Sequence, residues 1–293
     1  MKQAHYIGES KPLLTATIGQ CLQEVAAKQP DQPALIVCHQ GIRWTYREFL
    51  TEVDRLAAGL LALGTQPGDR VGIWAPNCYE WVLTQFATAR IGAILVCINP
   101  AYRLYELEYA LNKVECSVLV TAEQFKTSHY LRMLGELAPE LESSAPSELT
   151  ATKLPHLKSI VRMGDGKTPG MFNFSDVCNM GAAHADRIAE IGAALDPGDI
   201  INIQFTSGTT GNPKGAALTH TGILNNALFN GEKMRFSSAD RLCIPVPLYH
   251  CFGMVMGTLT CVVHGATMVL PAEVFEPEAT LKAVQDERST ASS

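Results

Sequence analysis

Short apolar strands alternate with amphipathic helices along most of the chain, and this alternation restricts the fold more than any other feature. The run 93–98 contains only apolar residues, as expected for a strand buried on both faces. The predicted helices are residues 45–63, 79–90, 104–113, 123–137 and 174–192, and the predicted strands are residues 71–74, 93–98, 117–121 and 159–163. The predicted fold class is therefore α/β, with a parallel sheet covered by helices on both sides.

One polar loop carries the clearest chemical signal in the sequence. Residues 206–215, Thr-Ser-Gly-Thr-Thr-Gly-Asn-Pro-Lys-Gly, lie between two predicted strands, 201–205 and 216–218. Its glycines let backbone N–H groups approach an anion, its hydroxyls donate hydrogen bonds, and Lys214 adds a positive charge. The loop is a candidate polyphosphate site without the spacing of a Walker P-loop. The alternative is a hairpin turn that binds no ligand.

Composition excludes several kinds of partner and site. The net charge is −6 with only 23 Lys and Arg residues, so we expect no basic surface for nucleic acid. The nine cysteines stand singly without a C-x-x-C pair, which is typical of a reduced, intracellular chain. The eight histidines show no metal-ligand spacing, so no metal site is expected from this chain.

Neither of the two segments that could indicate export or a membrane has the required pattern. Residues 1–5 contain no apolar or arginine-rich stretch, and we therefore expect a cytoplasmic protein. The uncharged stretch 252–270 contains Gly253, Gly257 and Gly265. A helix that ends at Gly265 and is followed by a strand explains this stretch better than a transmembrane segment.

The loop matches nine fixed positions of the T-S-G-T-T-G-x-P-K-G signature, and the chain resembles the adenylate-forming (AMP-binding) superfamily. The resemblance covers about residues 15–288 and is most similar to fatty acyl-CoA synthetases of the medium-chain type. Further phrases that resemble these synthetases are Thr45-Tyr46-Arg47-Glu48, Gly68-Asp69-Arg70-Val71, Ala75-Pro76-Asn77, Ile98-Asn99-Pro100-Ala101-Tyr102, Glu106-Leu107-Glu108-Tyr109 and Pro247-Leu248-Tyr249-His250-Cys251-Phe252-Gly253.

The resemblance implies a two-step ligase that uses ATP and takes CoA as a co-substrate. A fatty acid carboxylate would attack the α-phosphate of ATP, and the CoA thiol would then displace AMP. The residues implied to hold the β- and γ-phosphates are Thr206, Ser207, Gly208, Thr209, Thr210, Gly211 and Lys214. Lys214 and His250 are the implied catalytic residues, with His250 beside the carboxylate and adenylate. The alternative for His250 is a packed core histidine.

Other polar residues near these motifs receive a structural interpretation. Asn225, Asn226 and residues 253–257 could line an acyl tunnel, but an ordinary helix face is the preferred interpretation. We interpret His220 and His264 as structural residues.

The sequence lacks the later motifs of the superfamily, and we therefore expect an incomplete N-terminal domain with its C-terminal domain absent. Residues 68–234 are expected to form one α/β subdomain, and residues 15–67 with 235–293 part of a second, with the active site between them. The Mg²⁺ ligands are expected in the missing part. We expect this chain to be inactive alone. The alternative is a catalytically silent fragment that binds a nucleotide or a partner.

The last residues support the same expectation of an incomplete sheet. Residues 288–293 form a small polar tail where the family has an apolar strand. The predicted strands 242–246 and 266–270 would then have open edges, which favour self-association. The charged fraction of 18% gives little repulsion to oppose it.

Overall fold

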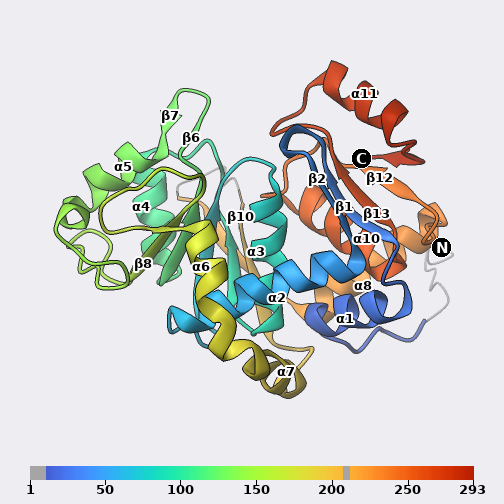
Figure 1. Ribbon diagram of the computed structural model, residues 1–293, viewed down its shortest axis with the longest axis horizontal. Coiled ribbons are helices and arrows are strands. Elements are labelled where there is room, and N and C mark those ends of the chain that lie inside the picture. The colour runs from blue at the N-terminus through green and yellow to red at the C-terminus, as the bar shows by residue number, and fades with distance from the viewer. Residues whose placement is uncertain (1–10, 207–211) are drawn as a thin grey trace, which may run out of the picture.

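The computed structural model describes residues 11–206 and 212–293, which are built around two sheets (Figure 1). The larger sheet has seven strands in the order β11-β10-β4-β3-β5-β8-β9. Its strands are β3 (Arg70–Trp74), β4 (Ile94–Cys97), β5 (Val118–Thr121), β8 (Ser159–Arg162), β9 (Phe172–Asn173), β10 (Ile200–Thr206) and β11 (Lys214–Thr219). All neighbours pair in parallel except β11, which runs antiparallel to β10. The predicted α/β sheet is thus confirmed, with one antiparallel edge strand.

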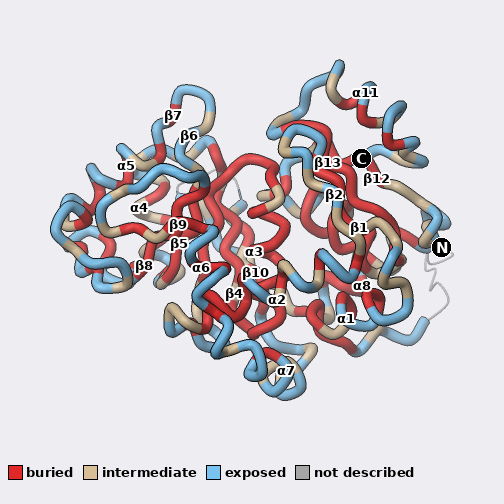
Figure 2. The backbone as a smooth tube through the Cα atoms, viewed as in Figure 1, coloured by how far each residue is buried: buried red, intermediate tan, exposed pale blue. Residues whose placement is uncertain are grey.

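Both faces of the larger sheet are buried (Figure 2). In β5, Val118 and Val120 point into a core shared with α2 (Tyr46–Ala62) and α3 (Tyr79–Arg90). Leu119 points into a separate core with α4 (Leu104–Lys113) and α5 (Tyr130–Leu137). Successive residues of a strand face opposite sides, so an all-apolar strand needs a helix layer on each side.

The second sheet has five strands in the order β14-β12-β13-β1-β2. They are β1 (Pro33–Val37), β2 (Ile42–Thr45), β12 (Arg241–Cys243), β13 (Thr267–Leu270) and β14 (Ala291–Ser292). Although β1 and β13 are far apart in sequence, they pair in parallel with Leu35 opposite Met268. One face of this sheet packs against α11 (Pro277–Asp286) through Ala283. The second sheet therefore joins the beginning of the chain to its end.

Helix α2, predicted as residues 45–63, contacts helices that cover the larger sheet and strands of the second sheet. Thr45 and Glu48 form a capping box at its start. The Tyr46 hydroxyl, fully buried, donates to the carbonyl of Ala266 at 2.7 Å beside β13. Along its length α2 contacts α3 and α6 (Phe174–Met180) as well as β1 and β2.

Two predicted helices differ from the structure. Residues 123–137 were expected to be one helix, but β6 (Gln124–Phe125) and β7 (Ser128–His129) form a hairpin before α5. The predicted helix 174–192 is divided into α6, a 3₁₀ turn and α7 (Ala185–Ala194). The pattern also missed α1 (Ile18–Lys28), β1 and β2.

The prediction that strands 242–246 and 266–270 of the second sheet have open edges is wrong. Strand β13 is paired on both sides, with β1 and β12. The polar tail forms β14, where Ala291 and Ser292 pair with Leu242 and Cys243 of β12. The backbone of a small polar residue forms the same hydrogen bonds as the backbone of an apolar residue. Open edges of these strands therefore no longer support the predicted self-association.

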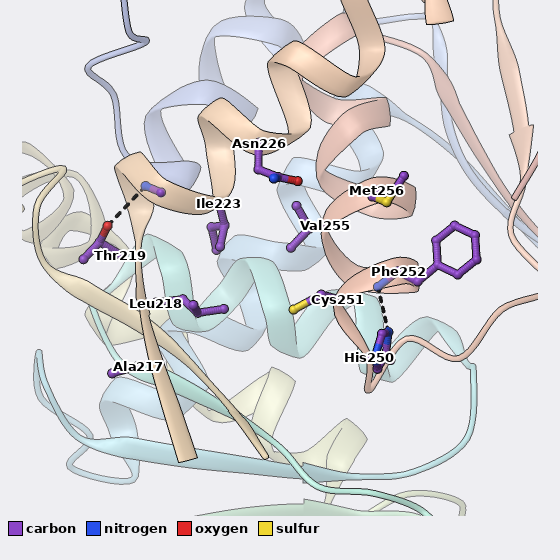
Figure 3. A pocket seen from close by; sticks show the side chains of 11 residues that line it. Ala217, Leu218, Thr219, Ile223, Asn226, His250, Cys251, Phe252, Val255 and Met256 are labelled. Atoms are coloured by element: carbon purple, nitrogen blue, oxygen red, sulfur yellow. Dashed lines mark hydrogen bonds between the residues drawn. The ribbon is translucent and has the colours of Figure 1, made fainter. Parts of the chain in front are cut away.

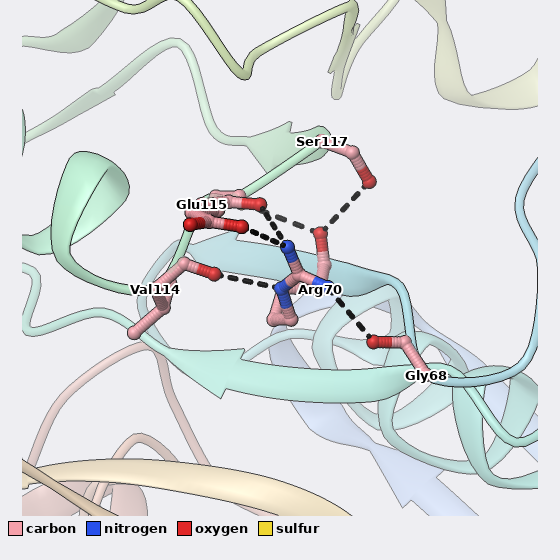
Figure 4. A network of polar contacts seen from close by, with 6 residues as sticks. Gly68, Arg70, Val114, Glu115 and Ser117 are labelled. Carbon is pink, nitrogen blue, oxygen red and sulfur yellow. Dashed lines mark hydrogen bonds and ion pairs between the residues drawn. The ribbon is translucent and has the colours of Figure 1, made fainter.

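Arg70, in one of the phrases that resemble the synthetases, has a structural role at the amino end of β3 (Figure 4). Its guanidinium donates to the carbonyls of Val114 at 2.7 Å and Glu115 at 3.0 Å. It also donates to the carbonyl of Gly68 at 3.1 Å. These bonds fix the connection between α4 and β5. This connection lies at the amino ends of the parallel strands, whereas the loop after β10 lies at their carboxyl ends.

Among the helices that the structure describes, none is long and apolar enough to cross a membrane. The stretch 252–270 contributes to α9 (Cys251–Gly253), a π-helix (Met254–Leu259), α10 (Thr260–His264) and β13. Gly265 ends α10 in the left-handed conformation, with φ of 69°. The prediction of a helix that stops at Gly265 before a strand is confirmed.

Candidate functional site

The hairpin β10–β11 places both described ends of the candidate phosphate loop at one edge of the larger sheet. Thr206 is opposite Lys214, and its hydroxyl donates to the Lys214 carbonyl at 3.3 Å. Both residues are exposed. Ser207, Gly208, Thr209, Thr210 and Gly211 lie outside the described residues. This edge is formed by the carboxyl ends of β10 and its parallel neighbours. Ligands of open α/β sheets bind at the carboxyl ends of the strands.

One contact at this loop was not predicted. Tyr105 of α4 is 66% exposed, and its hydroxyl donates to Asn212 Oδ1 at 3.1 Å. A pattern in the sequence cannot reveal this pair, because Tyr105 is on the polar face of a helix far from the loop in the chain. The contact connects α4 to the end of the loop that precedes β11.

His250 is exposed, so its alternative interpretation as a packed core histidine is wrong. It is the N-cap of α9, and its Nδ1 accepts a hydrogen bond from the Phe252 N–H at 3.1 Å. In the neutral ring, an acceptor Nδ1 requires the proton on Nε2. The cap therefore orients the imidazole and leaves Nε2 as a donor.

Asn77, also in a phrase that resembles the synthetases, holds the segment before His250. Its Oδ1 accepts from the Leu248 N–H at 2.9 Å, and its Nδ2 donates to the Val246 carbonyl at 2.9 Å. Both groups of this buried amide are thus used to fix residues 246–248.

A cavity of about 750 Å³ lies between β11, α8 (His220–Met234) and the segment that begins at His250 (Figure 3). Apolar side chains dominate its walls, and His250 lies at one side. The lining residues are Ala217, Leu218, Thr219, Gly222, Ile223, Asn226, His250, Cys251, Phe252, Val255 and Met256. The cavity can accept an apolar chain whose polar end is near His250.

The structure separates the residues that were considered for an acyl tunnel. Asn226, Val255 and Met256 line the cavity. Asn225 does not, because its amide is bonded to the backbone of Leu14. Gly253 packs against the Pro247 carbonyl, where an added Cβ would lie 2.4 Å from the oxygen. Cys251 and Phe252 also line the cavity, and the sequence patterns did not identify them as lining residues.

The π-helix that forms one wall of the cavity is anchored to the larger sheet and its helix layer. Thr258 Oγ1 donates to Gln85 Oε1 of α3 at 2.8 Å. Gln204 of β10 donates through Nε2 to Met254 Sδ at 3.6 Å. π-helical turns are rare and often occur at functional sites. These buried contacts set the position of Val255 and Met256.

His220 lies in the interior, as its structural interpretation predicted. It is fully buried, and its Nδ1 accepts from the Ile18 N–H at 3.1 Å. Burial lowers the pKa of His220 to about 4, opposed by the charge of Asp199. The folded protein therefore favours the neutral ring.

We expect acid to destabilise the protein through His220. Below pH 6.5 the unfolded chain binds a proton that the folded chain does not, so stability falls until about pH 4, by about 3 kcal/mol. His220→Asn keeps an acceptor at the Nδ1 position without this titration. Urea unfolding from pH 8 to pH 4 measures the difference, and parallel pH profiles for the two proteins would contradict this account.

Among residues 11–206 and 212–293, no group of three or more His, Cys, Asp or Glu side chains could hold a metal ion. Lys214 and Thr206 provide hydrogen-bond donors but no carboxylate. The described part of the candidate phosphate loop therefore supplies no carboxylate ligand for Mg²⁺.

Comparison with known proteins gives the site a context. The sequence matches the family described as AMP-binding enzyme over residues 22–293. It is 44% identical to the medium-chain acyl-CoA ligase ACSF2, mitochondrial, of Danio rerio, covering 96% of this chain and 47% of that protein. It is 39% identical to the putative acyl-CoA synthetase YngI of Bacillus subtilis (strain 168), covering 95% and 51%. The chain thus spans about half the length of the curated relatives it matches.

A solved structure shows the same fold. The anthranilate CoA ligase AuaEII, in complex with anthranoyl-AMP, aligns with a TM-score of 0.78 at 23% identity. The alignment covers 96% of this chain and 50% of that one. At this identity the likeness establishes the fold alone.

The comparisons also correct one prediction. We expected a cytoplasmic protein, whereas the ACSF2 relatives at 43–45% identity are named mitochondrial. The expectation relied on the absence of a targeting pattern in residues 1–5, and such an absence does not identify a compartment. The cytoplasmic prediction is therefore wrong.

Proposed function

Because the chain belongs to the AMP-binding enzyme family and has the α/β fold of adenylate-forming enzymes, we propose that it forms the fatty-acid- and phosphate-binding part of an ATP-dependent acyl-CoA synthetase. One observation carries the proposal: the apolar cavity shares strand β11 with the phosphate loop. Lys214 begins the strand, and Ala217 lines the cavity three residues later. At about 3.4 Å per residue, the loop is about 10 Å from the cavity wall.

The proposed reaction begins with a fatty acid whose chain fills the cavity and whose carboxylate lies near His250. The carboxylate oxygen attacks the α-phosphorus of ATP, forming the acyl–phosphate bond and releasing pyrophosphate. The Nε2–H of His250 supplies a donor for negative charge near the α-phosphate, and Lys214 with the loop donors holds the leaving group. The CoA sulfur then attacks the acyl carbon, the thioester C–S bond forms as the acyl–phosphate bond breaks, and AMP leaves while the thiol proton passes to water.

We place the active site between the two subdomains proposed from the sequence, 68–234 and 15–67 with 235–293. The cavity supports this assignment because its walls come from both ranges. Strand β11 and α8 contribute from the first, and residues 250–256 from the second.

The same proposal predicts that this chain does not turn over alone. It holds the phosphate loop and His250, and groups that act together in catalysis lose most of the rate when members are missing. Fused to the part of the Danio rerio relative that follows the matched region, it should catalyse ATP–pyrophosphate exchange that depends on fatty acid. Alone it should show none above background, with a nucleotide Kd of about 1 mM from phosphate contacts.

The alternative, a catalytically silent protein that binds a nucleotide or a partner, makes the opposite prediction for the fusion. A folded fusion, verified by circular dichroism, that binds ATP without fatty-acid-dependent exchange would favour this alternative. Acyl-CoA formation by the 293-residue chain alone would show that the residues proposed here are sufficient.

A further inference from the structure

Residues 11–18, which we name the N-terminal strap, run along helix α8 and are connected to it at three places. The Lys11 ammonium is 2.5 Å from Glu232 Oε2 near the end of the helix. Leu14 is bonded to Asn225 in the middle. The Ile18 N–H donates to His220 at the first residue of the helix. The strap therefore runs antiparallel to α8 over nearly its whole length.

The middle connection uses every polar group of the Asn225 amide. Oδ1 accepts from the Leu14 N–H at 2.7 Å, while Nδ2 donates to the Leu14 carbonyl at 3.0 Å and to the Thr221 carbonyl at 2.8 Å. The side chain is 5% exposed. Water cannot easily replace these bonds at a buried position, so the pair fixes one orientation of the helix.

A different face of the same helix forms a wall of the cavity. Gly222, Ile223 and Asn226 line it (Figure 3), and neighbouring residues of an α-helix point about 100° apart. Asn225 thus faces the strap while Asn226 faces the cavity. Any rotation of α8 that the strap prevents would displace Ile223 and Asn226 within the cavity wall.

After the cavity-lining turns, two polar contacts connect α8 to α10. The Thr260 hydroxyl donates to the Ala227 carbonyl at 3.4 Å, and His264 Nε2 is 3.3 Å from the Leu228 carbonyl. Both contacts come from α10 and involve residues after the cavity-lining turn. The first two turns, which line the cavity, depend on His220 and Asn225 for their polar connections to the strap.

We propose that the N-terminal strap is a positioning element of the acyl cavity, in which Asn225 and His220 act as positioning residues by fixing the rotation of α8. The strap thereby sets the shape of the wall formed by Ile223 and Asn226 and the chain length that the cavity prefers. The identity of the ligand as a fatty acid rests on the proposed function. The link between strap and helix does not.

The test removes one backbone donor from the strap. Ile18 is the first residue of α1, a position where proline is well tolerated in helices. Ile18→Pro eliminates the N–H that donates to His220, and Ile18→Val is the matched control with a similar loss of side-chain volume. Lys11→Met removes only the exposed ion pair, and we expect it to behave as the unmodified chain.

Two readouts are taken on the chain and its variants. Hydrogen–deuterium exchange of the amides of residues 220–226 should be faster in Ile18→Pro than in Ile18→Val. The Kd values for octanoate, dodecanoate and hexadecanoate should also change, with the preferred length bound about tenfold more weakly in Ile18→Pro, as for one lost hydrogen bond. The dependence of Kd on chain length should become flatter. A purely structural role would lower the Tm without changing this dependence.

Each outcome decides for or against the proposal. Equal exchange in Ile18→Pro and Ile18→Val overturns it, as does an unchanged length dependence in a protein that binds fatty acids. If the unmodified chain binds none of the three acids, the proposed function fails, and the exchange data alone decide whether the strap positions α8. If Ile18→Pro does not fold, Asn225→Asp replaces it, because it keeps the acceptor for Leu14 and removes the donor.

Discussion

Replacing Lys214 with alanine in the fusion protein is expected to slow fatty-acid-dependent pyrophosphate exchange by about 10²–10³-fold, the usual effect of losing one preorganised charge-stabilising group. Lys214 is exposed at the start of β11, opposite Thr206, so the substitution removes a charge without opening the core. The effect should appear in kcat, because the charge developing on the leaving pyrophosphate is greater in the transition state than in bound ATP.

The control for this experiment is Lys233→Ala. Lys233 is another exposed lysine, in the last turn of α8, and it does not line the cavity. We expect its exchange rate to equal that of the unmodified fusion. A Lys214→Ala protein with an unchanged rate would mean that the loop does not hold the phosphates.

A second large effect is expected for the stability of the chain. Gly59 lies inside α2, where an added Cβ would be 2.1 Å from the carbonyl oxygen of Val177 in α6. Alanine normally favours a helix, but here it must push a backbone segment away. We expect Gly59→Ala to lower the free energy of unfolding by about 3 kcal/mol.

The matched control is Gly135→Ala in α5. Outside the adjacent residues and the backbone of the helix itself, no atom lies within 4 Å of the Cβ that would be added there, so the helix preference of alanine acts alone. We expect a gain of about 1 kcal/mol. Urea unfolding of both variants measures the two effects, and equal stability of Gly59→Ala and the unmodified chain would show that α2 and α6 can separate at little cost.

Local patterns predicted the larger sheet because each of its elements is defined by residues close in sequence. The helix at Tyr79–Arg90 and the strand at Ile94–Cys97 have their predicted positions within one or two residues. The hairpin β6–β7 was missed because its apolar Phe125 also fits a helical pattern. Lys126 adopts a left-handed backbone, with φ of 51°, which a helix does not allow.

The second sheet was difficult to predict because its strands are stabilised by distant partners. Strand β14 contains only Ala291 and Ser292, whose side chains have no strand pattern. It exists because their backbone pairs with β12. The sequence of residues 288–293 alone therefore does not predict β14.

The candidate site was also predicted only where its residues are close in sequence. The loop that includes Lys214 was identified from ten consecutive residues, and His250 from its motif. Asn226 and residues 253–257 were considered for the cavity between them, but an ordinary helix face was preferred. The walls come from β11, α8 and the π-helix, which meet only in the folded chain. Gln85 and Gln204, which anchor the π-helix, are too distant in sequence for a local pattern to connect them.

The parallel pairing of β1 with β13 has a consequence for the order in which the molecule assembles. The strands of the larger sheet occupy one continuous stretch of chain, from Arg70 to Thr219. The Thr267 hydroxyl, by contrast, bonds to the Pro33 carbonyl across 234 positions of sequence. Contacts of such long range form late. During synthesis the β1–β2 hairpin therefore keeps one edge unpaired until β13 has left the ribosome. An unpaired edge can pair with another chain, so aggregation is favoured in this interval.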